Sequence, residues 1–178
     1  MSIEKGRILK MSKVLNTLLI IGGIVLILVM VSLMVLAITV PSVDQSEGVV
    51  ISVWGTSITL DGSVGTFRAS MIITMLSIGV MAAILLVASL IFKDMSREGM
   101  PFTEKNSNRI RVISLLLIAQ GLVVPPLQLL IAMVFSAADA SDYIGLDLSL
   151  IVIAIIFFCL ALIFEYGAEL QRQSDETL

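Results

Sequence analysis

Four long apolar segments dominate the hydropathy pattern of this chain, and each is almost free of charged residues. They lie at about residues 17–40, 70–92, 112–136 and 146–166. An α-helix rises about 1.5 Å per residue, so roughly 20 apolar residues cross the hydrocarbon core of a bilayer. The pattern therefore predicts an all-α fold, a four-helix transmembrane bundle in which residues 1–178 form a single domain.

Lysine and arginine are distributed very unevenly around these segments. Of the 11 Lys and Arg residues, all except Arg68 lie on one side of the four predicted spans. These residues are Lys5, Arg7, Lys10, Lys13, Lys93, Arg97, Lys105, Arg109, Arg111 and Arg172. Basic residues in short flanks stay in the cytoplasm during insertion. We therefore expect both termini, the loop at 93–111 and the tail at 167–178 to be cytoplasmic, in a multi-pass protein of the plasma membrane.

The composition agrees with a protein whose main partner is the lipid bilayer. Hydrophobic residues make up 58% of the chain and charged residues 14%, and the mean hydropathy is +1.08, far from the values of a soluble domain. The bases of the middle loop are offset by Asp94, Glu98 and Glu104. Attraction to anionic headgroups explains these bases more simply than nucleic acid does, so we expect no direct binding of nucleic acid.

The segment at 41–68 connects the first two spans and is expected to lie outside the cell. Residues 49–54 and 57–60 are rich in β-branched side chains and are separated by Gly55 and Thr56. This pattern predicts a short outer β-hairpin, which would rest on the bundle or on the lipid surface, with Trp54 at the interface. The alternative interpretation is a sensor loop for an external ligand.

The third span contains polar and helix-breaking residues near its middle. Pro125 and Pro126 remove two amide donors, so the helix is predicted to kink or break there. Gln120 and Gln128 flank this point. One interpretation is a transport path, because interrupted helices line such paths in transporters. The other is that the kink fits the helix around its neighbours while the glutamine amides bond across the bundle, and the lack of intramembrane charges favours this second interpretation.

The connection between the second and third spans contains signals that end one helix and start another. Gly99 is suited to end the first helix, and Pro101 prevents its continuation. Thr103 is placed to cap the next helix, with Glu104 in its first turn. The third helix is therefore predicted to start in the cytoplasm and to enter the membrane at about Arg111.

The charges at the cytoplasmic ends of the third and fourth spans predict an ion pair. Only seventeen residues separate Asp147 from Glu165, so Glu165 should lie close to an interface and require a cationic partner. We expect Glu165 or Glu169 to pair with Arg109 or Arg111, which lie at a similar depth.

An enzyme is the least expected class of protein. The chain contains no histidine, and its one cysteine, Cys159, is expected to be buried within the fourth span. Nucleophilic and metal-assisted chemistry therefore lack their usual groups, and we expect no catalytic residues, no metal site and no cofactor.

Two cytoplasmic segments resemble the bacterial family catalogued as domain of unknown function 2975. The first contains Phe-Lys-Asp at 92–94 and Gly-Met-Pro-Phe-Thr-Glu-Lys-Asn at 99–106, and the second is the terminal Tyr-Gly-Ala-Glu-Leu-Gln at 166–171 with Asp-Glu-Thr-Leu at 175–178. Gln173 stands where the family often has an acid. The resemblance is taken to cover the whole four-span layout, and it implies a membrane protein often encoded beside a small helix-turn-helix regulator.

Two functional hypotheses follow from these observations. In the first, the cytoplasmic rim is a tether or sensor for a small DNA-binding regulator. Its contacts would come from the polar and aromatic residues of the two cytoplasmic segments and of the adjoining helix ends, namely Phe102, Asn106, Arg109, Arg111, Glu165, Glu169, Gln171 and Asp175. In the alternative, the bundle or a homo-oligomer of it is a small transporter or accessory subunit, with its path lined by Gln120, Pro125, Pro126 and Gln128. Polar side chains facing a cavity would favour transport, and polar side chains at the rim would favour the tether.

Overall fold

The computed structural model describes residues 2–39, 49–53, 56–60, 64–98, 102–134 and 147–176. Its α-helices are α1 (Ser2–Thr39), α2 (Val64–Glu98), α3 (Glu104–Ile118), α4 (Val124–Val134) and α5 (Leu148–Glu176). Four helical segments are long and apolar enough to cross a membrane, as expected of a multi-pass membrane protein. Each of them overlaps one of the spans predicted from the hydropathy pattern.

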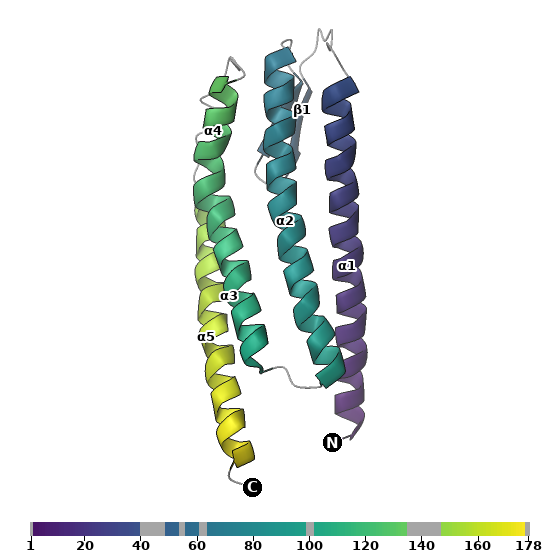
Figure 1. The fold of residues 1–178 in the computed structure, drawn as a ribbon, viewed down its shortest axis with the longest axis vertical. Coiled ribbons are helices and arrows are strands. Elements are labelled where there is room, and N and C mark those ends of the chain that lie inside the picture. The colour runs from purple at the N-terminus through teal and green to yellow at the C-terminus, as the bar shows by residue number, and fades with distance from the viewer. Residues whose placement is uncertain are drawn as a thin grey trace.

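The helices run up and down along one long axis (Figure 1). α1 packs beside α2, and α5 packs beside α3, so the bundle consists of two helix pairs that meet where α2 contacts α3 and α4. Both chain termini and the connection between α2 and α3 lie at the same end of the molecule (Figure 1). This arrangement agrees with the predicted topology, while the assignment of that end to the cytoplasm stays a prediction from the charge distribution.

Two strands pair between α1 and α2 in the chain, in the segment for which the β-hairpin is predicted. β1 (Val49–Val53) runs antiparallel to β2 (Thr56–Leu60), with Val49 opposite Leu60 and Val53 opposite Thr56. Trp54 and Gly55 lie outside the described residues, so the predicted position of Trp54 is not tested.

The third span is one continuous helical rod in which α3 and α4 are joined by a π-helical segment, η1 (Ala119–Val123). Of the two predicted outcomes at Pro125 and Pro126, a kink or a break, the break does not occur. The irregularity comes one turn earlier, where the amide of Val124 donates to the carbonyl of Ala119, five residues back. A π-helical turn widens the helix locally, and this widening accommodates two residues that lack an amide donor without ending the helix.

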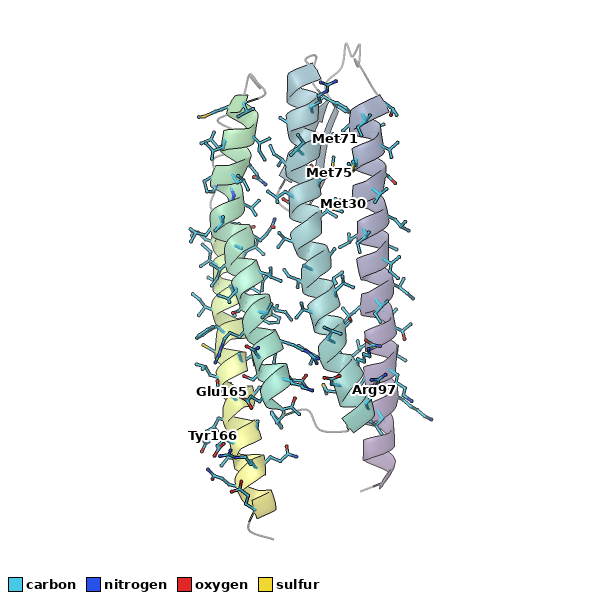
Figure 2. The ribbon with its side chains drawn as sticks, in the orientation of Figure 1. Met30, Met71, Met75, Arg97, Glu165 and Tyr166 are labelled. Carbon is cyan, nitrogen blue, oxygen red and sulfur yellow. The ribbon has the colours of Figure 1, made fainter. Side chains whose placement is uncertain are left out.

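The contact between α1 and α2 is apolar and depends on small residues. A Cβ added at Gly23 would lie 3.0 Å from Leu86 Cδ2, and one added at Gly79 would lie 3.8 Å from Met30 Sδ. Figure 2 shows Met30 on α1 and Met71 and Met75 on α2 along this contact. The helices approach closely at Gly23, since an α-carbon without a side chain lets a neighbouring helix come near, while the space at Gly79 would admit a Cβ in ordinary contact.

Burial differs strongly between the two helix pairs. In the most apolar stretch of α1 only 6% of the residues are buried inside the protein, against 44% in the span formed by α3 and α4. The largest buried cluster joins α2, α3 and α5, and it consists of Ile91, Ile110, Ile113, Leu117, Leu150, Ala154 and Ala161. Cys159 is exposed on the surface of α5, so its predicted burial is wrong. It lies within the span but faces away from the other helices.

Candidate functional site

The start of α3 is set by a side-chain cap that the sequence predicts. Thr103 has an extended backbone, and its hydroxyl accepts a hydrogen bond of 3.2 Å from the amide of Asn106. Glu104 lies in the first turn, where a carboxylate favours the positive end of the helix. Both predictions are confirmed, while Gly99 and Pro101 lie outside the described residues. The cap fixes which residues of α3 face its two neighbouring helices.

Arg109 links α3 to the end of α2. Its Nη1 atom donates to Asp94 Oδ2 at 2.7 Å, to the carbonyl of Leu90 at 2.8 Å and to Asn106 Oδ1 at 3.2 Å. The side chains of Arg109 and Asp94 are 24% and 19% exposed, and Asn106 is fully buried. Asn106 thus holds the guanidinium in place, and the pair joins the two halves of the bundle in a partly dehydrated site where a charge-assisted bond is strong.

Arg111 links α3 to α5. Its Nη2 atom donates to Glu165 Oε2 at 2.8 Å, so the predicted ion pair between the third and fourth spans is confirmed. Arg109 does not take part, because it points from the same helix towards Asp94 on α2. The two arginines are two residues apart, which is about 200° around a helix, so they serve different neighbours.

An aromatic side chain closes the same end of the α3–α5 contact. The ring of Phe102 lies against Gly167, where an added Cβ would be 2.8 Å from Phe102 Cδ1. Its centroid is 5.0 Å from that of Phe164, at an interplanar angle of 54°. Nearby, the hydroxyl of Ser107 donates to the carbonyl of Ala161 at 2.8 Å. Only a glycine leaves room for the ring, which explains the glycine of the terminal segment.

We call this set of contacts the rim cluster, because it ties α2, α3 and α5 together at the end of the bundle that carries both termini. Its members are Asp94, Phe102, Asn106, Ser107, Arg109, Arg111, Phe164, Glu165 and Gly167. Phe102 is 39% exposed and so stays accessible to a partner. Asn106 is fully buried, so its predicted contact with a partner needs correction.

The rest of the predicted partner residues lie further along α5. Glu169 accepts from Arg172 Nη2 at 3.1 Å and from Gln173 Nε2 at 3.0 Å, so it pairs along its own helix rather than with Arg109 or Arg111. Gln171 is half-buried, and the side chain of Asp175 lies outside the described residues. Figure 2 shows Glu165 and Tyr166 on the same stretch of α5. Tyr166 is 67% exposed and was missed as a candidate.

An open groove of about 960 Å³ lies between the start of α3 and the end of α5. Both segments that carry the family resemblance contribute to it. Its lining residues are Phe102, Thr103, Glu104, Leu162, Glu165, Tyr166, Ala168, Glu169, Gln171, Arg172 and Glu176. Four glutamates and one arginine make the groove acidic, and Phe102, Leu162 and Tyr166 make part of its surface apolar.

A smaller pocket of about 390 Å³ adjoins this groove and shares two glutamates with it. It is lined by Glu104, Lys105, Ser107, Asn108, Arg111 and Glu165. Every lining residue except Ser107 carries a charge or an amide, so the pocket is far more polar than the groove. We refer to it as the polar pocket.

The candidate residues inside the third span are not brought together on one surface. Gln128 is buried, and its Nε2 atom donates to Ser77 Oγ on α2 at 3.4 Å, so the predicted bond across the bundle is confirmed for this residue. Gln120 is also buried, and its Oε1 atom has no partner among the described residues. Pro125 is half-buried and Pro126 is exposed. Two of the four residues are thus buried, one is half-buried and one is exposed, and a transport path along them stays a prediction.

Several contacts of the rim cluster could not be found from the sequence. The ion pair of Arg109 with Asp94 and the contact of Phe102 with Gly167 depend on how α2 and α5 pack against α3. The family resemblance was a weak signal for these contacts. Its Phe-Lys-Asp segment contains Asp94, and its Tyr-Gly-Ala segment contains Gly167. Asp147 was placed at the interface, but its Oδ1 also accepts from the amides of Ser149 and Leu150 and so caps α5.

A family model described as protein of unknown function (DUF2975) matches residues 59–178. The match includes α2, α3, α4, α5 and the last two residues of β2, whereas α1 and β1 precede it. The expectation that the resemblance covers all four spans is therefore corrected to the last three. No curated protein and no solved structure matches the chain.

Proposed function

The chain belongs to this family of unknown function, and we propose that it is a membrane anchor that binds a small soluble regulator through the acidic groove between α3 and α5. The groove end of the bundle would face the cytoplasm. The chain has the four apolar helices that such an anchor needs. The four helices support only the anchoring part of the proposal, and the binding part rests on the chemistry of the groove.

The charge distribution supports the proposed orientation. The ten bases predicted to be cytoplasmic lie in the early turns of α1, at the end of α2, in the early turns of α3 and near the end of α5. All of these positions are at the end of the bundle that carries both termini (Figure 1). Arg68, near the start of α2, is at the opposite end. Retention of bases in the cytoplasm would orient the protein with the groove inside the cell.

The single observation that carries the proposal is the combination of four carboxylates with an exposed aromatic side chain. Glu104, Glu165, Glu169 and Glu176 line the groove, and Arg172 is the one base among its lining residues. Tyr166 is exposed beside them, and tyrosine is enriched at protein interfaces. An acidic groove repels nucleic-acid phosphates and attracts basic protein surfaces. A small DNA-binding regulator carries such a surface, and binding here would compete with its binding to DNA.

The transporter hypothesis has less support. The groove and the polar pocket both lie at the rim, and Gln128 is engaged with Ser77. Gln120 alone offers an unpartnered amide oxygen inside the span. A tether that holds its partner at the rim needs no path through the bilayer.

Crosslinking in cells tests the proposal. A photoreactive residue at Tyr166 should capture one soluble protein, which is then purified and its affinity for the full chain in nanodiscs measured. Reversing two groove charges, with Glu104→Lys and Glu169→Lys together, should weaken binding by at least about fivefold, because each charge contact at a solvated surface contributes about 0.2–1 kcal/mol and reversal adds repulsion.

A matched control is the charge reversal Lys10→Glu, since Lys10 is an exposed residue of α1 that does not line the groove. This variant should keep the wild-type affinity, and all variants should elute as the wild type does in size-exclusion chromatography. Capture of lipid alone, capture of further copies of the chain, or an affinity unchanged by the double charge reversal would each refute the tether.

A further inference from the structure

The polar pocket contains charged groups that have no partner in the protein. Among its lining residues, Arg111 is paired with Glu165, and Ser107 donates to the carbonyl of Ala161. The carboxylate of Glu104, the ammonium of Lys105 and the amide of Asn108 form no hydrogen bond or ion pair with any described residue. The pocket therefore offers one free negative group and one free positive group, a few residues apart on the first turns of α3.

The position of the pocket relates it to the lipid surface. On α3, Val112 and Leu115 follow the pocket and are 38% and 55% exposed. On α5, Leu162 and Ile163 precede Glu165 and are 48% and 58% exposed. Exposed apolar side chains of a transmembrane helix face acyl chains, so the boundary between apolar and charged surface passes within about one turn of the pocket. This is the depth at which lipid headgroups lie.

We propose that the polar pocket binds a phosphoethanolamine headgroup, with its phosphate on Lys105 and Asn108 and its ammonium on Glu104. A ligand with one anionic and one cationic end matches the two unpaired groups. The primary ammonium donates charge-assisted hydrogen bonds to a carboxylate, which a choline headgroup cannot do because its nitrogen carries no hydrogen. A glycerol headgroup has no cation for Glu104. The paired Arg111 and Glu165 form the wall of the pocket and hold its shape.

The pocket volume of about 390 Å³ leaves room for such a group, which is smaller than a typical drug-like ligand. The same phosphoethanolamine chemistry occurs in a lipid and in free glycerophosphoethanolamine. We assign the ligand to the lipid, since exposed apolar side chains begin within about one turn of the pocket and the acyl chains would extend along Val112 and Leu162.

Lipid retention by the full chain tests the proposal. The protein is reconstituted in nanodiscs with equal amounts of phosphatidylethanolamine, phosphatidylglycerol and phosphatidylcholine of identical acyl chains, and retained lipids are counted by native mass spectrometry. Phosphatidylethanolamine should exceed each of the other two by about two- to fivefold, the factor expected of one or two solvated charge contacts. Equal retention of all three lipids, or preference for phosphatidylglycerol, would overturn the proposal.

Two substitutions separate the roles of the free groups. Glu104→Gln should reduce the excess of phosphatidylethanolamine over phosphatidylglycerol to about one, because it removes only the partner of the ammonium. Lys105→Ala should lower the retention of all three lipids, because each carries the phosphate, and should keep the excess of phosphatidylethanolamine that Glu104 provides. Lys93→Ala is the matched control, since Lys93 lines neither the polar pocket nor the groove, and this variant should retain the wild-type lipid pattern.

A further arm distinguishes the lipid from the free ester. Glycerophosphoethanolamine is added at millimolar concentration to the protein in detergent before the lipid mixture. Retention of phosphatidylethanolamine should be unchanged, because the free ester lacks the acyl chains. Complete displacement would contradict the assignment to a lipid. A Glu104→Gln variant that keeps the full preference for phosphatidylethanolamine would contradict the proposed contacts, whichever source supplies the ligand.

Discussion

The rim cluster and the α1–α2 contact join helices in opposite ways. In the rim cluster, the contacts between helices are ion pairs, hydrogen bonds and one aromatic ring seated on a glycine. Along α1 and α2, Gly22, Gly23 and Gly79 face Leu85, Leu86 and Met30. The rim cluster depends on particular atoms at particular distances. The α1–α2 contact depends on complementary shape, which many combinations of apolar side chains can provide.

The difference shows where the specificity of this bundle resides. Lipid tails are as apolar as leucine, so burying apolar side chains between helices gains little over leaving them in the bilayer. Polar groups near the interface, by contrast, lose their partners when the helices separate or slide. The rim cluster therefore sets the register of α2, α3 and α5, whereas α1 can be positioned by close packing against α2 alone.

The largest expected effect is at Arg109, which bonds α2 and α3 at once. Arg109→Gln removes the ion pair and leaves Asp94, which is 19% exposed, and the carbonyl of Leu90 without their donor. We expect a loss of about 1.5–3 kcal/mol in the free energy of unfolding, the range for a hydrogen bond to a charged group. The measurement is equilibrium unfolding in mixed micelles. Arg97→Gln, in the last turn of α2, should cost less than about 0.5 kcal/mol. Equal losses for the two variants would show that the contacts of Arg109 between α2 and α3 stabilise the bundle no more than an exposed arginine does.

A smaller effect compares the same substitution in both contacts. Gly167→Ala forces a Cβ to within 2.8 Å of the Phe102 ring, which Phe164 supports, so we expect a loss of about 1–3 kcal/mol. Gly23→Ala meets the end of the Leu86 side chain at 3.0 Å, which can rotate away, and should cost under about 1 kcal/mol. Gly6→Ala, with open space around it, serves as the control. Both losses are measured by the same equilibrium unfolding. A larger loss for Gly23→Ala than for Gly167→Ala would contradict the expected difference between the two contacts.

The smallest expected effect concerns Arg111 and Glu165, which are 38% and 53% exposed. A double-mutant cycle with Arg111→Gln and Glu165→Gln should give a coupling energy of about 0.2–1 kcal/mol, because both charges are solvated. The coupling should fall when the salt concentration is raised to about 1 M, where the Debye length is about 3 Å. A coupling that persists in high salt would indicate that this pair is buried in the membrane-embedded protein, as the Arg109 pair is.

The sequence alone was sufficient for the spans and for the local signals at helix ends. Long uncharged segments predict membrane helices because both the bilayer thickness and the helix rise are fixed lengths. Thr103 and Glu104 act within one turn of their own helix, so their roles as cap and first-turn acid followed from their order in the chain. The pair of Arg111 with Glu165 was also within reach, because both residues flank spans at the same depth.

The direction in which each polar side chain points was decided only by the tertiary structure. Arg109 was as good a candidate for Glu165 as Arg111, and the choice depends on which side of α3 faces α2 and which faces α5. The prolines at 125 and 126 predicted a kink or a break, and the structure decided between them, since one π-helical turn preserves the helix. Hydropathy and local signals depend on neighbours along the chain, whereas partners between helices depend on rotation and register, which packing of the whole bundle determines.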